Sequence, residues 1–289
     1  MLISHVGFNT IPYNKNKSAK PSQIYFKQVK PEHFFINIKG YAKDLEWGDA
    51  VSKIANESKW NVFNSVKKEV ESIGEKYSKF YSEFTELPYG KLVDKGSRRG
   101  TTEIWKEWKY APYYDKCVEK IETAKELDEL TLAGSNSKYL SCQCQDKIDD
   151  KKITLTQIFK LASAKPKHAS YSIYFIHPPL ETSEALTNKA QTFLDELIPL
   201  KGKKLNKEEI NTAYQKIGAI HWCLAQGMPF ERGSAAIADI YTKSLFESLN
   251  IQTTPWKKGI APDWEAFLTP MDEYSEKYKS FFSKRFFIF

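Results

Sequence analysis

Apolar residues along most of this chain recur at steps of three and four positions, the spacing that places them on one face of an α-helix. The spacing holds over residues 49–84 and again over 185–249. It also holds over 104–132, although Pro112 interrupts it there. The pattern therefore predicts a chain that is mostly helical.

Two helix starts are marked in the second half of the chain. Asn206 followed three residues later by Glu209 has the spacing of a capping box, in which each residue's side chain bonds the backbone N–H of the other. Gly227 and Pro229 end the helix that begins there, and Ser234 starts the next one. The sequence predicts two long helices joined by a short turn.

Short stretches of β-branched and aromatic residues occur at 34–38 and 171–176. Such residues suit a pleated surface, and the second stretch stops at Pro178 and Pro179. We expect the two stretches to form a small sheet or hairpin. The predicted fold class is α+β, predominantly α-helical.

The polar segment 134–150 is the best candidate for a domain boundary. We expect it to be an exposed linker or insertion between an N-terminal lobe, residues 1–133, and a C-terminal helical lobe, residues 151–289. One compact unit is the alternative, because a chain of 289 residues fits either arrangement.

Composition and charge exclude several classes of protein. With 41% hydrophobic residues, the chain has enough apolar material for a core, which excludes a largely disordered protein. The net charge is +7, but of the 43 basic residues all except four are lysine. Proteins that read nucleic-acid sequence favour arginine, whose planar fork binds phosphate and guanine through two bonds. We therefore expect no nucleic-acid partner. The arginines are Arg98, Arg99, Arg232 and Arg285.

The ends of the chain and its cysteines bear on localisation. Residues 1–13 lack a basic leader, and no apolar run reaches the roughly 18–20 residues that span a bilayer. Four cysteines at this length fit a reducing compartment. We expect a cytoplasmic protein, or one delivered from a bacterium into another cell without a cleaved signal peptide. Residues 281–289 hold five phenylalanines, which predicts a tail that docks on the body or contacts a partner or a membrane surface.

Residue types that bind metals occur at Cys142, Cys144, His168 and His177. Their spacing is not that of a zinc finger or a zinc ribbon, so we expect no metal site. No motif identifies a cofactor, and the one ligand class that the chain suggests is of the nucleotide type, at the turn described next.

Residues 227–236 join the two predicted helices and are the best candidate for a binding site. Gly233, Ser234 and Ala235 are small, so a ligand can approach the first turn of the second helix, where free N–H groups attract anions. Arg232 precedes them and adds a two-pronged donor. We expect this turn to line the principal pocket and to bind phosphate or carboxylate. The alternative is an ordinary helix hairpin in which Ser234 is the N-cap.

The turn resembles the Fic-domain motif, His-Pro-Phe-x-x-Gly-Asn-Gly-Arg. Pro229, Phe230 and Gly233 match this motif, whereas Met228 stands in place of its catalytic histidine. The positions of its asparagine, second glycine and arginine are occupied by Ser234, Ala235 and Ala236. The resemblance implies a helix–loop–helix that holds the phosphates of a nucleotide, in a helical transferase of the effector or toxin kind.

Because Met228 replaces the histidine of that motif, His221 and Glu231 are the nearest candidate catalytic residues. His221 borders the apolar face of its helix, where a hydrogen-bonded core histidine is the alternative. Arg98 and Arg99 lie in a glycine-containing loop, where we expect a solvated basic loop rather than a phosphate site.

The leading functional hypothesis is a bacterial effector- or toxin-like enzyme that transfers a group from a nucleotide-type donor to a protein target. The alternative is a non-catalytic binding protein that engages a macromolecular partner through its aromatic surface and its C-terminal tail. The sequence leaves open whether the protein is an enzyme.

Overall fold

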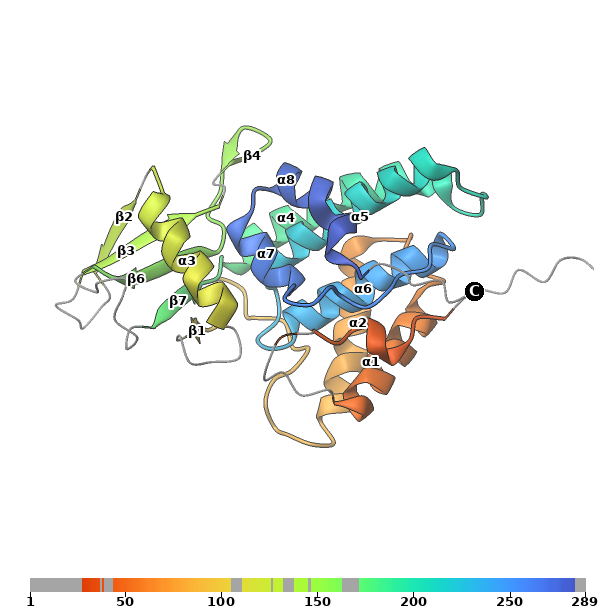
Figure 1. The fold of residues 1–289 in the computed structure, drawn as a ribbon. Helices are drawn as coiled ribbons and strands as arrows, with labels where there is room; N and C mark the ends of the chain where they lie inside the picture. Colours follow the sequence, from red (N-terminus) through yellow and green to blue (C-terminus); the bar gives the residue numbers. More distant parts are fainter. Residues whose placement is uncertain are drawn as a thin grey trace, which may run out of the picture.

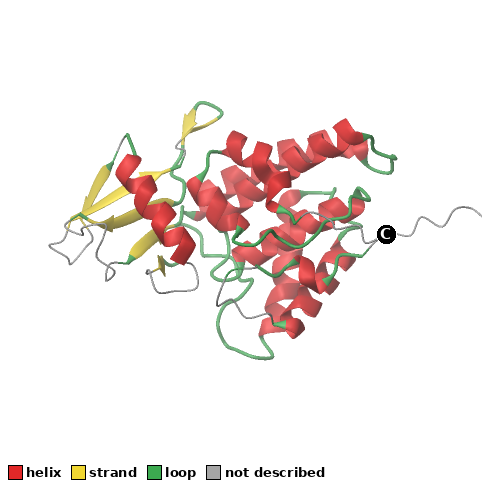
Figure 2. Ribbon diagram, in the orientation of Figure 1, coloured by secondary structure: helices red, strands yellow, loops and turns green. Residues whose placement is uncertain are grey.

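Helices build the larger part of the structure, and a small antiparallel sheet lies at one end of it (Figures 1 and 2). The computed structural model describes residues 28–36, 38, 44–104, 111–125, 127–131, 138–144, 147–162 and 172–283. The α-helices are α1 (Leu45–Ser58), α2 (Val66–Tyr81), α3 (Ala111–Thr123), α4 (Leu180–Leu197), α5 (Lys207–Gly227), α6 (Ser234–Ser248), α7 (Pro262–Leu268) and α8 (Met271–Lys277). Short 3₁₀ helices are η1 (Pro31–His33), η2 (Ile198–Leu200) and η3 (Tyr278–Phe281).

Helix α5 lies at the centre of the helical part and packs against α4, α6 and α8 (Figure 1). The predicted capping box is present at its start: the Asn206 side chain accepts from the backbone N–H of Glu209, and the Glu209 carboxylate accepts from that of Asn206. From Ala219 to Gly227 every residue is buried, so this half of the helix is enclosed on all sides. The turn between α5 and α6 therefore begins at the buried end of α5.

The sheet has the strand order β1-β7-β6-β3-β2 within the described residues, and each neighbouring pair is antiparallel. Its strands are β1 (Thr102–Ile104), β2 (Asp128–Thr131), β3 (Lys138–Gln143), β6 (Gln157–Leu161) and β7 (Ile173–Ile176), and a separate hairpin joins β4 (Lys147–Ile148) to β5 (Lys151–Lys152). Helix α3 covers one face of the sheet (Figure 1). Trp264 and Phe267 of α7 pack into the same core, against Phe175 of β7. This second core joins the sheet to the helical part.

A buried polar joint also connects the two parts of the molecule. His177, which follows β7, bonds Thr102 at 3.0 Å and Thr156 at 3.3 Å. Gln226, near the end of α5, accepts from the backbone N–H of Thr156 at 3.1 Å and donates to the carbonyl of Ala266 at 2.8 Å. The sheet is therefore fixed to α5 and α7 next to the turn that follows α5.

The predicted fold class is confirmed, because helices predominate and a small sheet is present. The helical spacing at 49–84 forms α1 and α2, and the strand expected at 171–176 is present as Ile173–Ile176. The helical pattern at 104–132 is only partly right, since it holds α3 between β1 and β2.

The strand expected at 34–38 is wrong for the residues of that stretch that the structure describes. Phe34 and Phe35 follow a 3₁₀ turn and pack against Trp47 of α1, with ring centroids 6.5 and 6.3 Å away. Phe34 also lies beneath the ammonium group of Lys243 in α6. The stretch is apolar because Phe34 packs in the helical core and Ile38 in the core beside the sheet, not because it pairs with another strand.

The expected boundary at 134–150 stays a prediction about domain limits. Strand β3 lies within it and pairs with both β2 and β6.

Of the phenylalanine-rich tail, Phe281 and Phe282 are buried, and the tail pairs with the segment around Trp256. Residues 284–289 lie outside the described part, so membrane contact by the tail stays a prediction. No described helix is long and apolar enough to cross a membrane.

Candidate functional site

The turn between α5 and α6 is held by the loop between α2 and β1. Met228 ends α5 in the left-handed conformation, with φ 42°, which reverses the chain. The turn then runs beside the extended segment 89–93. Main-chain N–H groups donate to carbonyls across this contact from Gly90 to Arg232 at 3.0 Å, from Glu231 to Lys91 at 2.9 Å and from Val93 to Pro229 at 3.0 Å.

Gly233 and Ser234 fix the start of α6. Gly233 has φ +86°, and a Cβ atom there would lie 2.6 Å from Cε1 of Tyr77, so both the backbone and the packing require glycine. The Ser234 hydroxyl is buried; it donates to the carbonyl of Phe230 at 3.1 Å and accepts the N–H of the same residue at 3.0 Å. Ser234 therefore closes the turn and has no free hydroxyl for a ligand. The residue that caps α6 is Gly233, not Ser234 as the hairpin alternative expected.

Arg232 is exposed on the outside of this turn. Its guanidinium carbon lies 5.9 Å from the ring centroid of Tyr89, in a cation–π contact. Tyr89 in turn stacks on Tyr81 of α2, with ring centroids 4.0 Å apart and planes 9° apart. The ring pair supports the guanidinium and leaves its N–H groups to solvent or a ligand.

Arg99 reaches the same place from the loop before β1. Its Nη1 donates to the sulfur of Met228 at 3.1 Å, so its guanidinium lies against the start of the turn. Burial lowers the pKa of Arg99; nearby Asp263 opposes this effect, and the positive charge of Arg232 adds to it. Arginine stays charged even after such a shift. Two positively charged side chains, Arg99 and Arg232, therefore belong to the same turn.

Asp263 supplies a carboxylate to this cluster from the first turn of α7. Burial raises the pKa of Asp263 to about 6, although backbone N–H groups and the charge of Arg99 lower it. A group with this pKa changes its charge near neutral pH. We call Arg99, Arg232 and Asp263 the arginine site.

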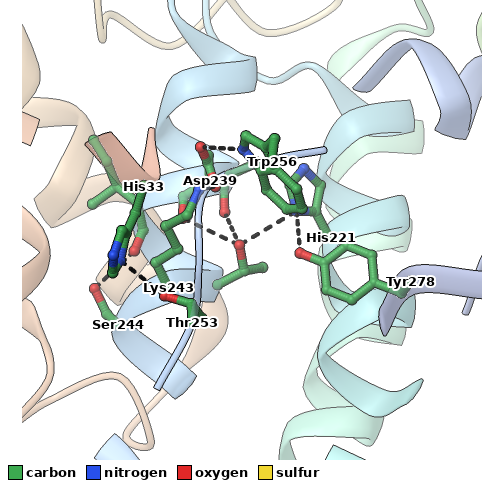
Figure 3. A network of polar contacts seen from close by, with 11 residues as sticks. His33, His221, Asp239, Lys243, Ser244, Thr253, Trp256 and Tyr278 are labelled. Atoms are coloured by element: carbon green, nitrogen blue, oxygen red, sulfur yellow. Dashed lines mark hydrogen bonds and ion pairs between the residues drawn. The ribbon is translucent and has the colours of Figure 1, made fainter. Parts of the chain in front are cut away.

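His221 lies elsewhere, inside the helical core (Figure 3). Its Nδ1 is 2.7 Å from the hydroxyl of Tyr278 and 3.3 Å from that of Thr242. Burial, with the charge of Lys243 adding to it, lowers the pKa of His221 to about 3, so the ring is neutral at physiological pH. The core alternative describes this residue. Its Nε2 is buried and takes no hydrogen bond among the described residues.

A buried ion pair on α6 lies near His221 of α5 (Figure 3). Lys243 and Asp239 pair one helical turn apart, and the Trp256 indole donates to the other oxygen of Asp239 at 3.2 Å. The Lys243 ammonium also lies 4.2 Å from the ring centroid of Trp256. We call His221, Asp239, Lys243, Trp256 and Tyr278 the buried network.

Of the residues that the sequence singled out, Glu231 and Ala235 are partly buried beside the turn. Ala235 packs on the core under the sheet. Sequence reasoning missed Arg99 and Asp263. The solvated basic loop expected for Arg98 and Arg99 does not describe Arg99, which is partly buried against Met228 through a loop contact that has no sequence signal. Asp263 follows only an ordinary Pro-Asp helix start.

The expectation that the turn lines the principal pocket finds no support in the described residues. A cavity of about 1070 Å³ opens instead along α1 and lies next to η1. Its lining residues are Gln28, Val29, Lys30, Pro31, Asp49, Ser52, Lys53, Asn56, Glu57, Trp60 and Gln252. None of them belongs to the turn.

The side chains of Cys144 and His177, which are of metal-binding types, make hydrogen bonds to protein groups.

The C-terminal part of the chain that contains the turn is similar to known proteins. Residues 198–285 match the avirulence-protein family AvrB_AvrC. The match runs from η2 to the end of η3 and includes the turn, Arg232, Asp263 and the buried network. Avirulence protein B of Pseudomonas savastanoi pv. glycinea is 38% identical over 64 residues, which are 22% of this chain and 20% of that protein. The similarity thus spans about a fifth of the length of this relative.

The resemblance to the Fic motif is wrong, because the same residues belong to the segment that matches avirulence proteins. The three matching residues have local structural reasons. Pro229 and Phe230 hold the loop 89–93, and Gly233 provides the conformation that starts α6. Met228 fills the second core and contacts Arg99. The effector part of the functional hypothesis agrees with the match to a virulence-related family; the transfer reaction stays a prediction.

Proposed function

We propose that this chain is a bacterial virulence effector that acts inside a host cell on a protein target, and that the arginine site binds the phosphate groups of a nucleotide-type donor. The avirulence-family match supports the effector class and a protein target. The observation that carries the ligand is the contact of Arg99 with Met228, which brings a second of the four arginines in the chain to the turn that contains Arg232.

The electrostatics favour an anion there. Two guanidinium groups that repel each other are stabilised when a doubly charged anion lies between them, because each donates charge-assisted hydrogen bonds. The first N–H groups of α6 lie next to Arg232 and add the positive end of a helix dipole. Asp263 balances part of this charge in the absence of a ligand, which the mutual effect of Asp263 and Arg99 on their pKa values reflects.

In a transfer reaction, the arginines would hold the phosphate leaving group of the donor and neutralise its developing charge. A carboxylate at the rim, Asp263 or Glu231, would accept the proton of the attacking group of the target. We assign no step to His221, whose ring is enclosed in the core. The non-catalytic alternative would use the same site for binding only.

Calorimetric titration with inorganic pyrophosphate tests the ligand. We expect Arg232→Ala and Arg99→Ala each to weaken binding about tenfold or more, since a charged hydrogen bond contributes about 1.5–3 kcal/mol. Arg98→Ala is the matched control: Arg98 is the exposed neighbour of Arg99, and its main chain pairs with Pro179 instead. It should bind pyrophosphate within about twofold of the wild type.

Equal losses in all three variants would mean that pyrophosphate senses only general positive charge, and the assignment to the arginine site would then be wrong. Undiminished binding in both Arg99→Ala and Arg232→Ala would contradict the proposal directly. Hydrolysis or transfer measured with nucleoside diphosphate donors then separates the enzyme from the binding protein.

A further inference from the structure

A row of aromatic rings leads from the surface to the arginine site. The ring centroids of Phe84 and Phe80 are 5.2 Å apart, those of Phe80 and Tyr81 5.2 Å, and those of Tyr81 and Tyr89 4.0 Å. Tyr89 lies beneath Arg232. We call the four rings, Phe80, Tyr81, Phe84 and Tyr89, the aromatic row. It connects the open surface with the candidate anion site.

Large apolar side chains are exposed along the same stretch of chain. Phe84 is 55% exposed, Leu87 48% and Leu92 36%. Exposed apolar side chains are common singly, but a group of them beside a candidate site is typical of a surface that binds another molecule. The surface is therefore suited to an apolar partner.

A free main-chain edge accompanies these side chains at Leu92. Leu92 lies opposite Phe230 in an antiparallel bridge, and its neighbours Lys91 and Val93 make the hydrogen bonds to the turn. In this geometry the amide and carbonyl of Leu92 point away from the turn. Among the described residues neither group takes a hydrogen bond. An extended peptide can add to such an edge as a strand does.

Charge argues against a nucleic acid or an anionic membrane as the occupant. The exposed charged residues around the aromatic row are Lys79, Glu83, Glu86 and Lys91, two of each sign, and Arg232 at its inner end. Because four of these five charges cancel, the surface away from Arg232 gives no net attraction to a polyanion. An apolar peptide without a strong net charge fits this surface better.

We infer that the aromatic row and the Leu92 edge dock an extended apolar segment of the protein target, which holds an acceptor side chain of that segment beside Arg99 and Arg232. Tyr89 and Leu92 are three residues apart and so at most about 11 Å apart. A segment of five or six residues, at about 3.3 Å each, covers both. The inference rests on the proposed function for the identity of the partner.

The test uses the full chain and a phage-displayed library of random dodecapeptides. A peptide selected from it is then synthesised and titrated by fluorescence anisotropy. We expect the selected sequences to carry apolar residues at alternate positions, as a strand with one face on the aromatic row requires. Phe84→Ser should weaken binding of the peptide about tenfold, the loss expected for an aromatic anchor. When the central backbone amides of the peptide are methylated one at a time, methylation at one of these positions should weaken binding by a similar factor.

The matched control is Leu45→Ser, which removes an equally exposed apolar side chain from the start of α1 (67% exposed). It should bind the peptide within about twofold of the wild type. Selected sequences with apolar residues every three or four positions, or equal binding by Phe84→Ser, would overturn the inference. So would a wild-type dimer that Phe84→Ser converts to a monomer, because a second copy of the chain would then be the occupant.

Pyrophosphate titration of the same variants separates this inference from the proposed function. Phe84→Ser should bind pyrophosphate as the wild type does, and Arg232→Ala should still bind the peptide. If pyrophosphate binding fails in the wild type while the peptide binds, the anion site is wrong and the docking surface stands. The opposite result rejects the docking surface alone.

Discussion

Two polar regions lie within helix α6 and just before its start, and they differ in how their charges are satisfied. At Asp239 and Lys243 the charges are buried and paired with each other, and Trp256 bonds the remaining carboxylate oxygen. Just before the same helix, Arg232 is exposed over Tyr89, and Arg99 contacts Met228 in the same turn. One region is closed by its own partners, and the other keeps an excess of one charge.

This difference shows why burial and a shifted pKa do not by themselves identify a functional site. The buried network has the larger shifts: burial lowers the pKa of His221 to about 3 and that of Lys243 to about 8. Its two charged groups nonetheless pair with each other, and His221 Nε2, which takes no hydrogen bond among the described residues, is enclosed in the core. The arginine site holds two positive charges and one carboxylate, so an added anion would balance its charge. Unbalanced charge at an accessible surface is the better criterion.

The largest effect is expected when the buried pair is broken. Lys243→Met removes the partner of Asp239 and should lower the free energy of unfolding by about 3–5 kcal/mol, because an uncompensated carboxylate is left in the core. The same variant should bind pyrophosphate within about twofold of the wild type, since Lys243 does not face the turn. Urea denaturation and calorimetric titration measure the two quantities.

A double variant, Asp239→Asn with Lys243→Met, serves as the control because it removes both charges. It should recover part of the lost stability, as replacement of a whole buried pair often does. If Lys243→Met instead keeps its stability and loses pyrophosphate binding, the two regions are one site and the comparison fails.

Sequence reasoning was most successful where one local pattern decides the structure. The capping box at Asn206 and the helical spacing of α1, α2 and α5 depend on residues within one or two turns of each other. The strand expected at 34–38 failed because a short apolar run reads the same whether it pairs in a sheet or packs on helices. There the neighbours in space, Trp47 and Lys243, decided the outcome.

The candidate site was only half predictable for the same reason. Arg232 and Gly233 are adjacent to the helix start that made them candidates. Arg99 is 129 residues away in sequence from Met228, its contact in the turn. It is brought there by the preceding loop 89–93, whose main chain pairs with the turn. His221 was given as a candidate base because it is near the turn in sequence, but helix α5 points it into the core. Sequence distance from a turn is therefore a poor guide to membership of its site.

Lowering the pH should reduce the free energy of unfolding by a smaller amount, because the buried His221 must stay neutral in the folded state. The folded-state pKa of His221, about 3, lies below the ordinary value of 6.5, so the stability it contributes is complete above pH 6.5 and is lost as the pH falls. Between pH 7 and 5 the loss should be about 2 kcal/mol. His177, whose pKa burial also lowers, acts in the same direction.

Urea denaturation at several pH values measures this loss. In His221→Asn the free energy of unfolding should fall less steeply between pH 7 and 5 than in the wild type, whatever its stability at pH 7. The comparison of slopes remains valid if the variant is less stable overall. Parallel slopes would mean that His221 takes up a proton in the folded protein, and its place in a closed network would then be wrong.

The smallest expected effect concerns Asp263, the one carboxylate in the arginine site whose charge changes near neutral pH. Its pKa is raised to about 6, so above that pH it is negative and competes with an anion for Arg99. Sulfate, which stays divalent, should bind the wild type about two- to fivefold more weakly at pH 7.5 than at pH 5, the size expected for one partly screened charge. The charged groups that act on Asp263 leave this sign unchanged: Arg99 stays charged, and ionisation of Asp239, whose charge raises the pKa of Asp263, opposes an anion in the same direction. Asp263→Asn keeps the shape of the side chain, so it should bind sulfate at pH 7.5 as tightly as the wild type does at pH 5 and show a flat pH profile.

A raised carboxyl pKa also means that ionisation costs stability above pH 6, so the variant should melt at a higher temperature than the wild type at pH 7.5 but not at pH 4. Weaker sulfate binding by Asp263→Asn would show that the carboxylate positions Arg99 for the anion instead of competing with it.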